Sequence, residues 1–515
     1  MSQVIASEAD RAQLAELGIT PEEVERQVAL FVRPPAPMRL ARPCTLGDGI
    51  RSLSEAERRA AGDAHAAAAA AGRISKFTPA SGAASRMFQS LLTARTGDLR
   101  RRDVVAARAA EGDAVAADVL TFLDNLPRFA FAEDLAAAAA RHGRPLAALL
   151  EAGDVGAVLD TLLTPAGLDY AAAPKGLLLF HRYPEGPRTA FEEHLVETAA
   201  VARDAHGTAR LHLTVSPEHA AGFGALLQRV RTACEGRLEA RYEVGFSTQR
   251  RSTDTIAVDG DNRPFRTADG QLLFRPGGHG ALIDNLDALR GDLVFIKNID
   301  NVQPDEQRGP GIEWMRILLG HAAGLQQAIG AHLEALRGAG QDAVAAAGRF
   351  AADALGLSLP AGATAGALTA MLERPLRVCG VVRNTGEPGG GPFWVRGADG
   401  GVSAQIVESA QVDHGDPDQR AVFAAATHFN PVFLACAVRD AGGRPFDLQR
   451  FIDASAVFIA RKSKDGRELK ALERPGLWNG AMAHWLTVFV EVPEATFTPV
   501  KTVNDLLRPA HQPRA

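Results

Sequence analysis

The sequence predicts an α/β protein with a mixed, mostly parallel sheet and helices on both faces. Strand-like and helix-like runs alternate in the order β-α-β-α-β over residues 176–246, which is typical of parallel strands joined by crossover helices. The apolar run over 292–297 ends in polar residues and indicates a further buried strand. From Leu376 onward the chain is rich in short strand-like runs, whereas 98–168 and 310–372 carry helical periodicity.

We expect four parts along the chain. They are a helical arm (1–72), an α/β half (73–307) with a helical insertion (98–168), a second helical insertion (308–375) and a β-rich half that completes the sheet (376–515). Local signals mark helix starts within these parts. Thr20 before Pro21 is a good N-cap pair, and Thr189 with Glu192 three residues later predicts a capping box.

The composition excludes several classes of protein. The chain has 515 residues and a net charge of −5 without a run of Lys and Arg, which argues against a nucleic-acid partner. Its four cysteines are far apart and form no CxxC, so neither a disulfide framework nor a zinc cluster is expected. The first residues are acidic and lack an apolar signal core, and no 18-residue apolar stretch occurs. We therefore expect a cytoplasmic protein without a membrane span.

One stretch, RISKFTPASGAASRMF over residues 73–88, raises the possibility of a phosphate site. A strand-like run is followed by six tiny residues from Ala80 to Ser85, and then by Arg86 and an apolar helical start. Tiny residues let the backbone approach a ligand closely, and a turn between a strand and a helix N-terminus suits phosphate. The alternative is close packing of helix on strand, which needs small residues as well.

Four other stretches place polar residues next to strands. Lys175 precedes a strand-like run, Asp300 follows one, and Lys501 stands just ahead of a helix. A second small-residue turn, RPGGHGALIDNL, covers 275–286. Because ligands of open α/β sheets lie at the carboxyl ends of strands, we expect these residues to converge. Lysines would neutralise phosphate charge and Asp300 would hold Mg²⁺, although each also has a structural alternative as a surface lysine, a plain turn or a cap.

In this order the stretches resemble the nucleotidyltransferases that make nucleotide sugars, and the UDP-sugar pyrophosphorylase branch most closely. PASGAASRM and PKGLLLF look like the family's Gly-rich loop ending in Arg and its Pro-Lys pair. The resemblance implies a Rossmann-like sheet of the GT-A type, with the nucleotide bound by the half at 73–307 and the sugar by the half at 376–515. The first loop has one Gly where the family usually has several, and Gly176 stands where a Pro often follows the Lys, which points to a divergent bacterial branch.

The resemblance also implies a role for individual residues, through the stretches FSTQRR, RPGGHG, FIKNIDN, QIVE, LWNGAM and FTPVKTVNDLL. The residues implied as catalytic charges are Arg86, Lys175 and Lys501. Those implied in nucleotide binding are Ala80, Ser81, Gly82, Ala83, Ser85, Gln249, Gly278, His279 and Gly280. Those implied in sugar binding are Glu408, Asn479 and Gly480, and the implied metal ligand is Asp300.

Taken together, the residues and the resemblance predict a Mg²⁺-dependent enzyme that joins a nucleoside triphosphate, UTP by resemblance, to a sugar 1-phosphate. The products are a nucleotide sugar and pyrophosphate. Two alternatives stay open. The first is a non-catalytic nucleotide-sugar sensor, because the first loop has fewer glycines than the family usually has. The second is a GT-A-type glycosyltransferase that uses Asp259 and Asp261, although this pair also fits a hairpin turn. The sequence names neither the sugar nor the oligomeric state.

Overall fold

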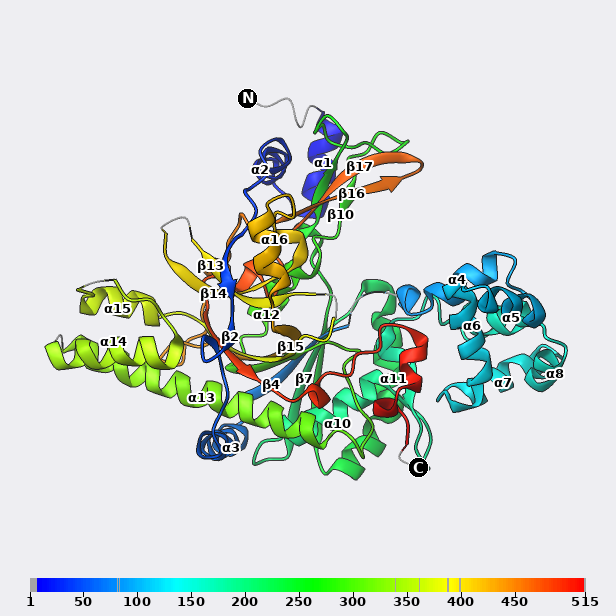
Figure 1. The fold of residues 1–515 in the computed structure, drawn as a ribbon, viewed down its shortest axis with the longest axis horizontal. Coiled ribbons are helices and arrows are strands. Elements are labelled where there is room, and N and C mark those ends of the chain that lie inside the picture. Colours follow the sequence, from blue (N-terminus) through cyan, green and yellow to red (C-terminus); the bar gives the residue numbers. More distant parts are fainter. Residues whose placement is uncertain are drawn as a thin grey trace. The chain divides into compact units, whose positions relative to one another are not determined.

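The computed structural model describes residues 7–80, 82, 84–338, 340–360, 362–386, 389–397 and 400–513 (Figure 1). The chain divides into two compact units, each assembled from several segments. Unit 1 comprises 1–77, 247–296 and 315–492, and unit 2 comprises 78–246, 297–314 and 493–515. The predicted division into four consecutive parts stays a prediction.

Unit 1 contains most of a large mixed sheet. Its strands lie in the order β2 (Thr45–Leu46), β3 (Gly49–Arg51), β18 (Leu486–Glu491), β12 (Leu376–Arg383), β15 (His428–Ala437), β11 (Leu293–Lys297) and β4 (Ile74–Pro79). The pairs β2–β3, β3–β18, β18–β12 and β11–β4 are parallel, and β12–β15 is antiparallel. All five residues of β11 are buried, as expected for strands covered on both faces. The predicted mixed, mostly parallel sheet is confirmed.

Two smaller sheets complete the strands of unit 1. One has the order β1 (Arg39–Pro43), β13 (Gly391–Arg396) and β14 (Val402–Val407); the other has the order β10 (Phe274–Arg275), β9 (Thr255–Val258), β17 (Arg467–Glu473) and β16 (Phe458–Lys464). Residues Arg39–Pro43 lie within the predicted helical arm, but they pair with β13 as an edge strand. The turn after β9 is the predicted hairpin turn, since Asp259 N donates to Arg263 O at 2.8 Å.

Unit 1 also contains helices in its described part. They are α1 (Glu8–Leu17), α2 (Pro21–Val32), α3 (Glu55–Ala70), α12 (Ile283–Ala288), α13 (Gly309–Arg337, which begins in unit 2), α14 (Gln341–Leu355), α15 (Ala365–Leu372) and α16 (Pro417–Ala424). Thr20 caps α2 as predicted, because its side chain accepts from Glu23 N. The helical periodicity predicted over 310–372 corresponds to α13, α14 and α15.

Unit 2 is mainly helical around one large apolar core. In the strand order of the large sheet, β4 is followed by β7 (Thr208–Thr214) and then by β8 (Arg241–Ser247). Its helices are α4 (Gln89–Thr96), α5 (Arg102–Ala110), α6 (Ala114–Asp124), α7 (Ala132–Arg141), α8 (Leu146–Glu151), α9 (Val155–Leu163), α10 (Ala190–Ala202) and α11 (Pro217–Leu238). Figure 1 shows α4–α8 grouped together in blue to cyan, and these helices correspond to the helical periodicity predicted over 98–168.

The strand expected over 176–183 is shorter than predicted and does not belong to the large sheet. Residues Lys175–Leu177 form a 3-10 turn, which leaves only β5 (Leu179–His181) extended. β5 pairs antiparallel with β6 (Arg188–Thr189), which runs directly into α10. The prediction of a parallel strand here was wrong, because β5 forms its strand hydrogen bonds with the nearby β6 in an antiparallel pair.

No helix in the described part of the chain is long and apolar enough to span a membrane.

Candidate active site

The small-residue turn after β4 is anchored at both ends and exposed in its middle. Ala80 N donates to Thr214 O at 2.9 Å and Ala84 N to Ala173 O at 2.8 Å, and both side chains are buried. Gly82 is exposed with φ of 107°, a conformation that favours glycine. Close packing therefore explains Ala80 and Ala84. Ser81 and Ala83 lie outside the described residues, and Ser85 is exposed on a 3-10 turn.

Arg86 ends this turn and lies beside the stretch that follows Lys501. Its side chain is exposed and lines a small pocket of about 30 Å³ together with Asp118, Thr502 and Asn504. The backbones are joined as well, since Val503 N donates to Met87 O at 3.0 Å. The first and the last of the predicted phosphate-binding stretches are thus neighbours within unit 2.

Lys175 connects the middle stretches. Its Nζ lies 2.7 Å from Asp300 Oδ2, and it also donates to Val500 O at 2.7 Å. Val500 N in turn donates to the backbone oxygen of Asp300 at 3.1 Å. The two charged side chains are each 19% exposed, so a ligand can still reach them. Three predicted stretches that are far apart in sequence therefore meet at one ion pair.

Side-chain packing explains why a glycine, Gly176, follows Lys175. A Cβ at Gly176 would lie 2.6 Å from the ring of Phe223, a distance that no real contact allows. The aromatic ring of α11 occupies the space that a proline would need. This departure from the family pattern is therefore local packing, and Lys175 reaches Asp300 from the 3-10 turn with its long side chain.

Lys501 is half-buried ahead of a capped turn. Its backbone N–H donates to Asp505 Oδ2 at 2.8 Å, as does that of Thr502 at 2.7 Å. The ammonium lies 5.9 Å from the centre of the Phe497 ring, at the outer limit of a cation–π contact. This geometry fixes the backbone of the predicted phosphate-binding stretch.

The described residues contain no group of three or more His, Cys, Asp or Glu side chains that would hold a metal ion by themselves. Asp300 is therefore a single carboxylate, paired with Lys175. Mg²⁺ is commonly held by one or two carboxylates together with waters and substrate phosphates. The residues present fit a metal that arrives with a nucleotide, and they do not fit a resident metal centre.

A second cluster of predicted residues lies in unit 1. The rings of His279 and Trp478 stack with centroids 4.2 Å apart and planes 21° apart. Leu477 N donates to His279 Nδ1 at 3.1 Å, and Trp478 Nε1 donates to Glu408 Oε1 at 3.1 Å. His279 Nε2 lies 3.9 Å from the same carboxylate oxygen. Three predicted stretches thus meet here too.

The ionisation of this cluster follows from its partial burial. Burial lowers the pKa of His279 to about 4, so the ring is neutral at pH 7 and Nδ1 is free to accept the backbone hydrogen bond. Burial also raises the pKa of Glu408, while the indole N–H of Trp478 opposes that shift. A carboxylate beside an aromatic face is suited to a hydroxylated ring, because it accepts hydroxyl hydrogens while the ring covers apolar C–H surface.

Asn479 lies behind this cluster. It is 1% exposed, and its Nδ2 donates to Ile406 O at 3.3 Å and Gln411 Oε1 at 3.2 Å. Its Oδ1 has no hydrogen-bond partner among the described residues. The structure therefore places Asn479 as a support of the strand end that carries Glu408, with one acceptor unused.

The predicted glycines of this unit are explained by close approach of two segments. A Cβ at Gly280 would lie 2.1 Å from Pro475 O, and one at Gly480 would lie 2.5 Å from Ala456 Cβ. Gly278 has φ of 75°. Gln249 makes its side-chain contact elsewhere: its Nε2 lies 3.5 Å from Asp254 Oδ1.

Sequence reasoning missed a set of buried polar residues in unit 2. They are Glu193, His194 and Glu197 on α10 and their partners His181, Lys297 and Arg308. The spacing of Glu193 and Glu197, one helical turn apart within an otherwise apolar helix, was the available signal.

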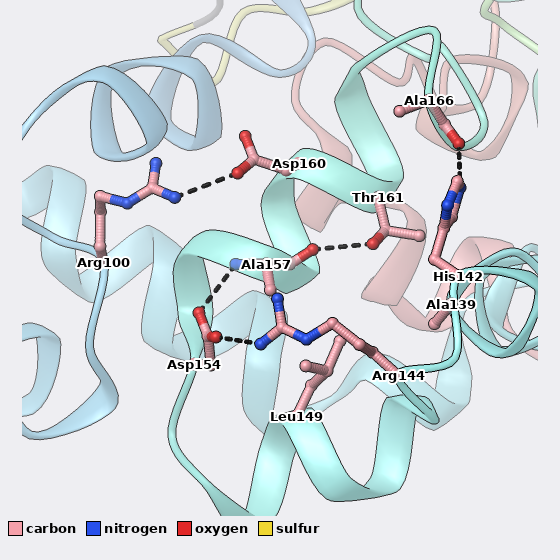
Figure 2. Close-up of a pocket in the computed structure, with 10 residues that line it drawn as sticks. All are labelled: Arg100, Ala139, His142, Arg144, Leu149, Asp154, Ala157, Asp160, Thr161 and Ala166. Carbon is pink, nitrogen blue, oxygen red and sulfur yellow. Dashed lines mark hydrogen bonds and ion pairs between the residues drawn. The ribbon is translucent and has the colours of Figure 1, made fainter.

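A separate pocket of about 250 Å³ opens in the first helical insertion (Figure 2). Arg100 donates to Asp160 at 3.0 Å, Arg144 pairs with Asp154, and the ring of His142 bonds Ala166 O. Each arginine is neutralised by a carboxylate of the same wall, so the pocket offers no surplus charge for a triphosphate. None of the predicted site residues lines it.

Comparison with known proteins identifies the fold. The UDP-N-acetylglucosamine pyrophosphorylase of Trypanosoma brucei in complex with an inhibitor aligns over 98% of this chain and 79% of its own, with a TM-score of 0.50 and 13% identity. The UDP-glucose pyrophosphorylase of Leishmania major aligns over the same shares, with a TM-score of 0.45 and 13% identity. No curated protein matches the sequence. The chain has a UDP-sugar pyrophosphorylase-like fold.

One family model matches nearly the whole chain, residues 7–512, and it is described as a domain of unknown function, DUF4301. The chain belongs to the DUF4301 family.

Proposed function

We propose that this protein is a nucleotidyltransferase that converts a nucleoside triphosphate, UTP first among them, and a sugar 1-phosphate into a nucleotide sugar and pyrophosphate. An oxygen of the sugar phosphate attacks the α-phosphorus of the triphosphate in line. The new P–O bond forms as the bond to the bridging oxygen of the β-phosphate breaks, and pyrophosphate leaves. No covalent intermediate with the protein is required.

The observation that carries the proposal is the contact of Lys175 with Asp300 and Val500. It joins three stretches that resemble nucleotidyltransferase motifs and that are 125 and 325 positions apart from Lys175. A purely structural ion pair has no need for this combination of a lysine, a carboxylate and the backbone next to Lys501. Phosphoryl and nucleotidyl transfer depend mainly on positioning and charge neutralisation, which these groups supply.

The phosphate chemistry is assigned to unit 2. Arg86 and the turn that includes Gly82 and Ser85 bind the triphosphate and the leaving pyrophosphate. Lys175 and Lys501 stabilise charge that develops on the transferring phosphates. Asp300 would hold Mg²⁺, which supplies further positive charge to the phosphates when bound.

Sugar and base recognition is assigned to unit 1. Glu408 accepts sugar hydroxyls, and Asn479 holds its strand end in place. The Gly278–Gly280 turn with neutral His279 contacts the base or ribose through its backbone. UTP is preferred over other triphosphates only on the strength of the resemblance.

The glycosyltransferase alternative loses support from the turn that carries its acids. Asp259 Oδ1 accepts from Asp261 N and Arg263 N, both at 2.9 Å, so Asp259 stabilises the hairpin. Asp261 is exposed and 3.6 Å from Arg263. These are the contacts of a surface turn and not of a metal-binding pair.

The decisive experiment is a pyrophosphate-release assay in Mg²⁺ that crosses four nucleoside triphosphates with a panel of sugar 1-phosphates. Release with one pair, lost in Asp300→Asn and kept in Asp261→Asn, would establish the reaction and name both substrates. If no pair releases pyrophosphate but calorimetry detects binding of a UDP-sugar, the protein is a nucleotide-sugar sensor and not an enzyme. Transfer of the sugar from a nucleotide sugar to an acceptor, with the nucleotide as leaving group, would favour the glycosyltransferase if it is lost in Asp261→Asn and kept in Asp300→Asn.

A further inference from the structure

The turn that carries Asp300 rests on a buried histidine. We propose that His194 is a positioning residue of the reaction: it fixes the peptide unit before Asp300, while Thr78 and Glu197 face its other ring nitrogen. This inference rests on the proposed function, because it assigns Asp300 to the phosphate chemistry.

The contact itself is short and fully enclosed. His194 Nε2 lies 3.1 Å from the backbone oxygen of Ile299, and the imidazole is 0% exposed. A carbonyl oxygen only accepts, so Nε2 carries the hydrogen. On the other side of the ring, Nδ1 lies 3.4 Å from Thr78 Oγ1 and 3.7 Å from Glu197 Oε2. Both ring nitrogens therefore face a polar group.

The Ile299 oxygen is well placed to control Asp300. It lies in the same planar peptide unit as the Asp300 nitrogen and Cα. Holding that oxygen sets the orientation of the plane, and with it the direction in which the Asp300 side chain leaves the backbone. The next peptide unit is held as well, because Val500 N donates to Asp300 O.

A buried ion pair stands at the start of the same turn. Lys297, the last residue of β11, places Nζ 2.6 Å from Glu197 Oε1, and both side chains are 2% exposed. Burial lowers the pKa of Lys297, and the partner carboxylate opposes this. Removing two charges from water is costly, so such a pair adds little net stability and is better explained as a device that fixes geometry.

The far end of the turn is fixed independently. Asn301 is 1% exposed, its Nδ2 donates to Thr496 O at 3.2 Å, and Thr498 N donates to its Oδ1 at 2.9 Å. The side chains of Lys297 and Asn301 and the backbone oxygens of Ile299 and Asp300 are thus held by neighbouring protein groups, and the carboxylate of Asp300 meets Lys175. The geometry points to a turn built to present that carboxylate in one orientation.

The test compares three variants with the full-length protein. His194→Leu removes the donor, and His194→Gln places an amide N–H near the position of Nε2. Tyr242→Phe is the matched control, because the buried Tyr242 hydroxyl donates to Leu195 O on the same helix at 2.8 Å without touching the turn. We expect His194→Leu to lower kcat about 10- to 100-fold with KM for both substrates nearly unchanged. His194→Gln should restore most of kcat, and Tyr242→Phe should retain it.

Two readouts do not depend on turnover. The affinity for Mn²⁺ in the presence of UTP, measured by electron paramagnetic resonance, should fall in His194→Leu and not in Tyr242→Phe. Side-chain ¹⁵N spectra should show a hydrogen on Nε2 of His194, and hydrogen exchange at residues 298–301 should quicken only in His194→Leu. Equal losses of kcat in His194→Leu and Tyr242→Phe, or unchanged kcat in both, would overturn the inference.

Failure of the proposed function is recognised separately. If the wild type releases no pyrophosphate with any substrate pair, the reaction assigned to this protein is wrong. The ring tautomer and the exchange of 298–301 then still decide whether His194 holds the turn: unchanged exchange in His194→Leu refutes it.

Discussion

Charged side chains in the interior of unit 2 occur as pairs whose exposure differs. Lys175 and Asp300 are each 19% exposed, whereas Lys297 and Glu197 are each 2% exposed. The first pair can exchange its partner for a ligand, because water and solutes reach it. The second cannot, and a change to either member leaves a charge in the interior without its counterpart.

The exposed pair should matter for rate more than for stability. Asp300→Asn is expected to lower pyrophosphate release about 10²- to 10³-fold, since one charged group is lost from the phosphate site. Its free energy of unfolding should change little, because Lys175 is partly exposed and keeps its hydrogen bond to Val500 O. Steady-state kinetics and urea unfolding measure the two effects, with Asp259→Asn as the carboxylate control. Full turnover in Asp300→Asn would refute the assignment.

The enclosed pair, Lys297 and Glu197, should affect the free energy of unfolding strongly. Lys297→Met is expected to reduce the free energy of unfolding by about 3–5 kcal/mol, because Glu197 is left charged and buried. Lys297→Met combined with Glu197→Leu should recover most of that loss, since the unpaired charge is removed. Urea unfolding of the single and double variants checks this. A double variant less stable than the single one would contradict it.

The sequence was sufficient to single out charged residues of the candidate site, but not their partners. Asp300, Lys175 and Glu408 were predicted from local stretches. Their contacts come from positions far along the chain, and nothing in the sequence pattern encodes the approach of Val500 to Lys175 or of Trp478 to Glu408. Asn479 was predicted to contact sugar, whereas its described contacts are to neighbouring protein groups.

At the scale of elements, α10 is the centre of the polar network in unit 2. Eleven of its 13 residues are buried, and Glu193 accepts from the His181 ring at 2.9 Å, from Tyr183 Oη at 2.7 Å and from Arg308 at 2.6 Å. The 3-10 turn Pro509–His511 reaches the same network, because His511 Nδ1 lies 3.0 Å from His181 Nε2. The segment after Lys501 is thereby fastened to β5.

This contact makes stability depend on pH. Burial, and then the neighbouring His181, lower the pKa of His511 to about 3, from an ordinary value of 6.5; Arg508 adds to this, while Glu193 and the Thr498 backbone oppose it. Between these two pKa values, His511 therefore binds a proton in the unfolded chain but not in the folded chain. Stability from this residue is complete above pH 6.5 and is lost as the pH falls from 6.5 towards 3.

The matching experiment is urea unfolding at pH 7 and pH 5 for the wild type and His511→Gln. The wild type should lose about 2 kcal/mol more than the variant between these two pH values, which is the linkage expected for one such histidine. The Glu193 carboxyl, with a pKa of about 2, does not titrate in this window. Equal losses in both proteins would show that His511 is not the group responsible.

Helices were predicted better than short strands. The helical periodicity of 98–168 and 310–372 and the capping box at Thr189 are local properties, and the structure contains these helices and this cap. The strand over 176–183 was assigned to the large sheet because its composition is apolar, but the hairpin with β6 satisfies it locally. An apolar composition indicates that a segment is buried, but it does not indicate which neighbouring segment buries it.

For the whole molecule, the four cysteines are free thiols and all are buried. Burial raises the pKa of Cys379 to about 11 and also raises that of Cys436. A thiol reagent at pH 8 should therefore label no cysteine of the native protein within minutes and all four in urea. Reductant should leave the melting temperature unchanged. Rapid labelling of the native protein would contradict the described packing.

The two units are interleaved along the chain, which passes from one to the other at residues 77, 246, 296, 314 and 492. During translation, unit 1 is complete only when residue 492 has been made, and unit 2 waits for segment 493–515. That segment brings Val500 to Lys175 and His511 to His181. A nascent chain released after residue 492 would carry every residue of unit 1 and an unfinished partner, so a late stop codon should yield a chain that quality-control proteases recognise.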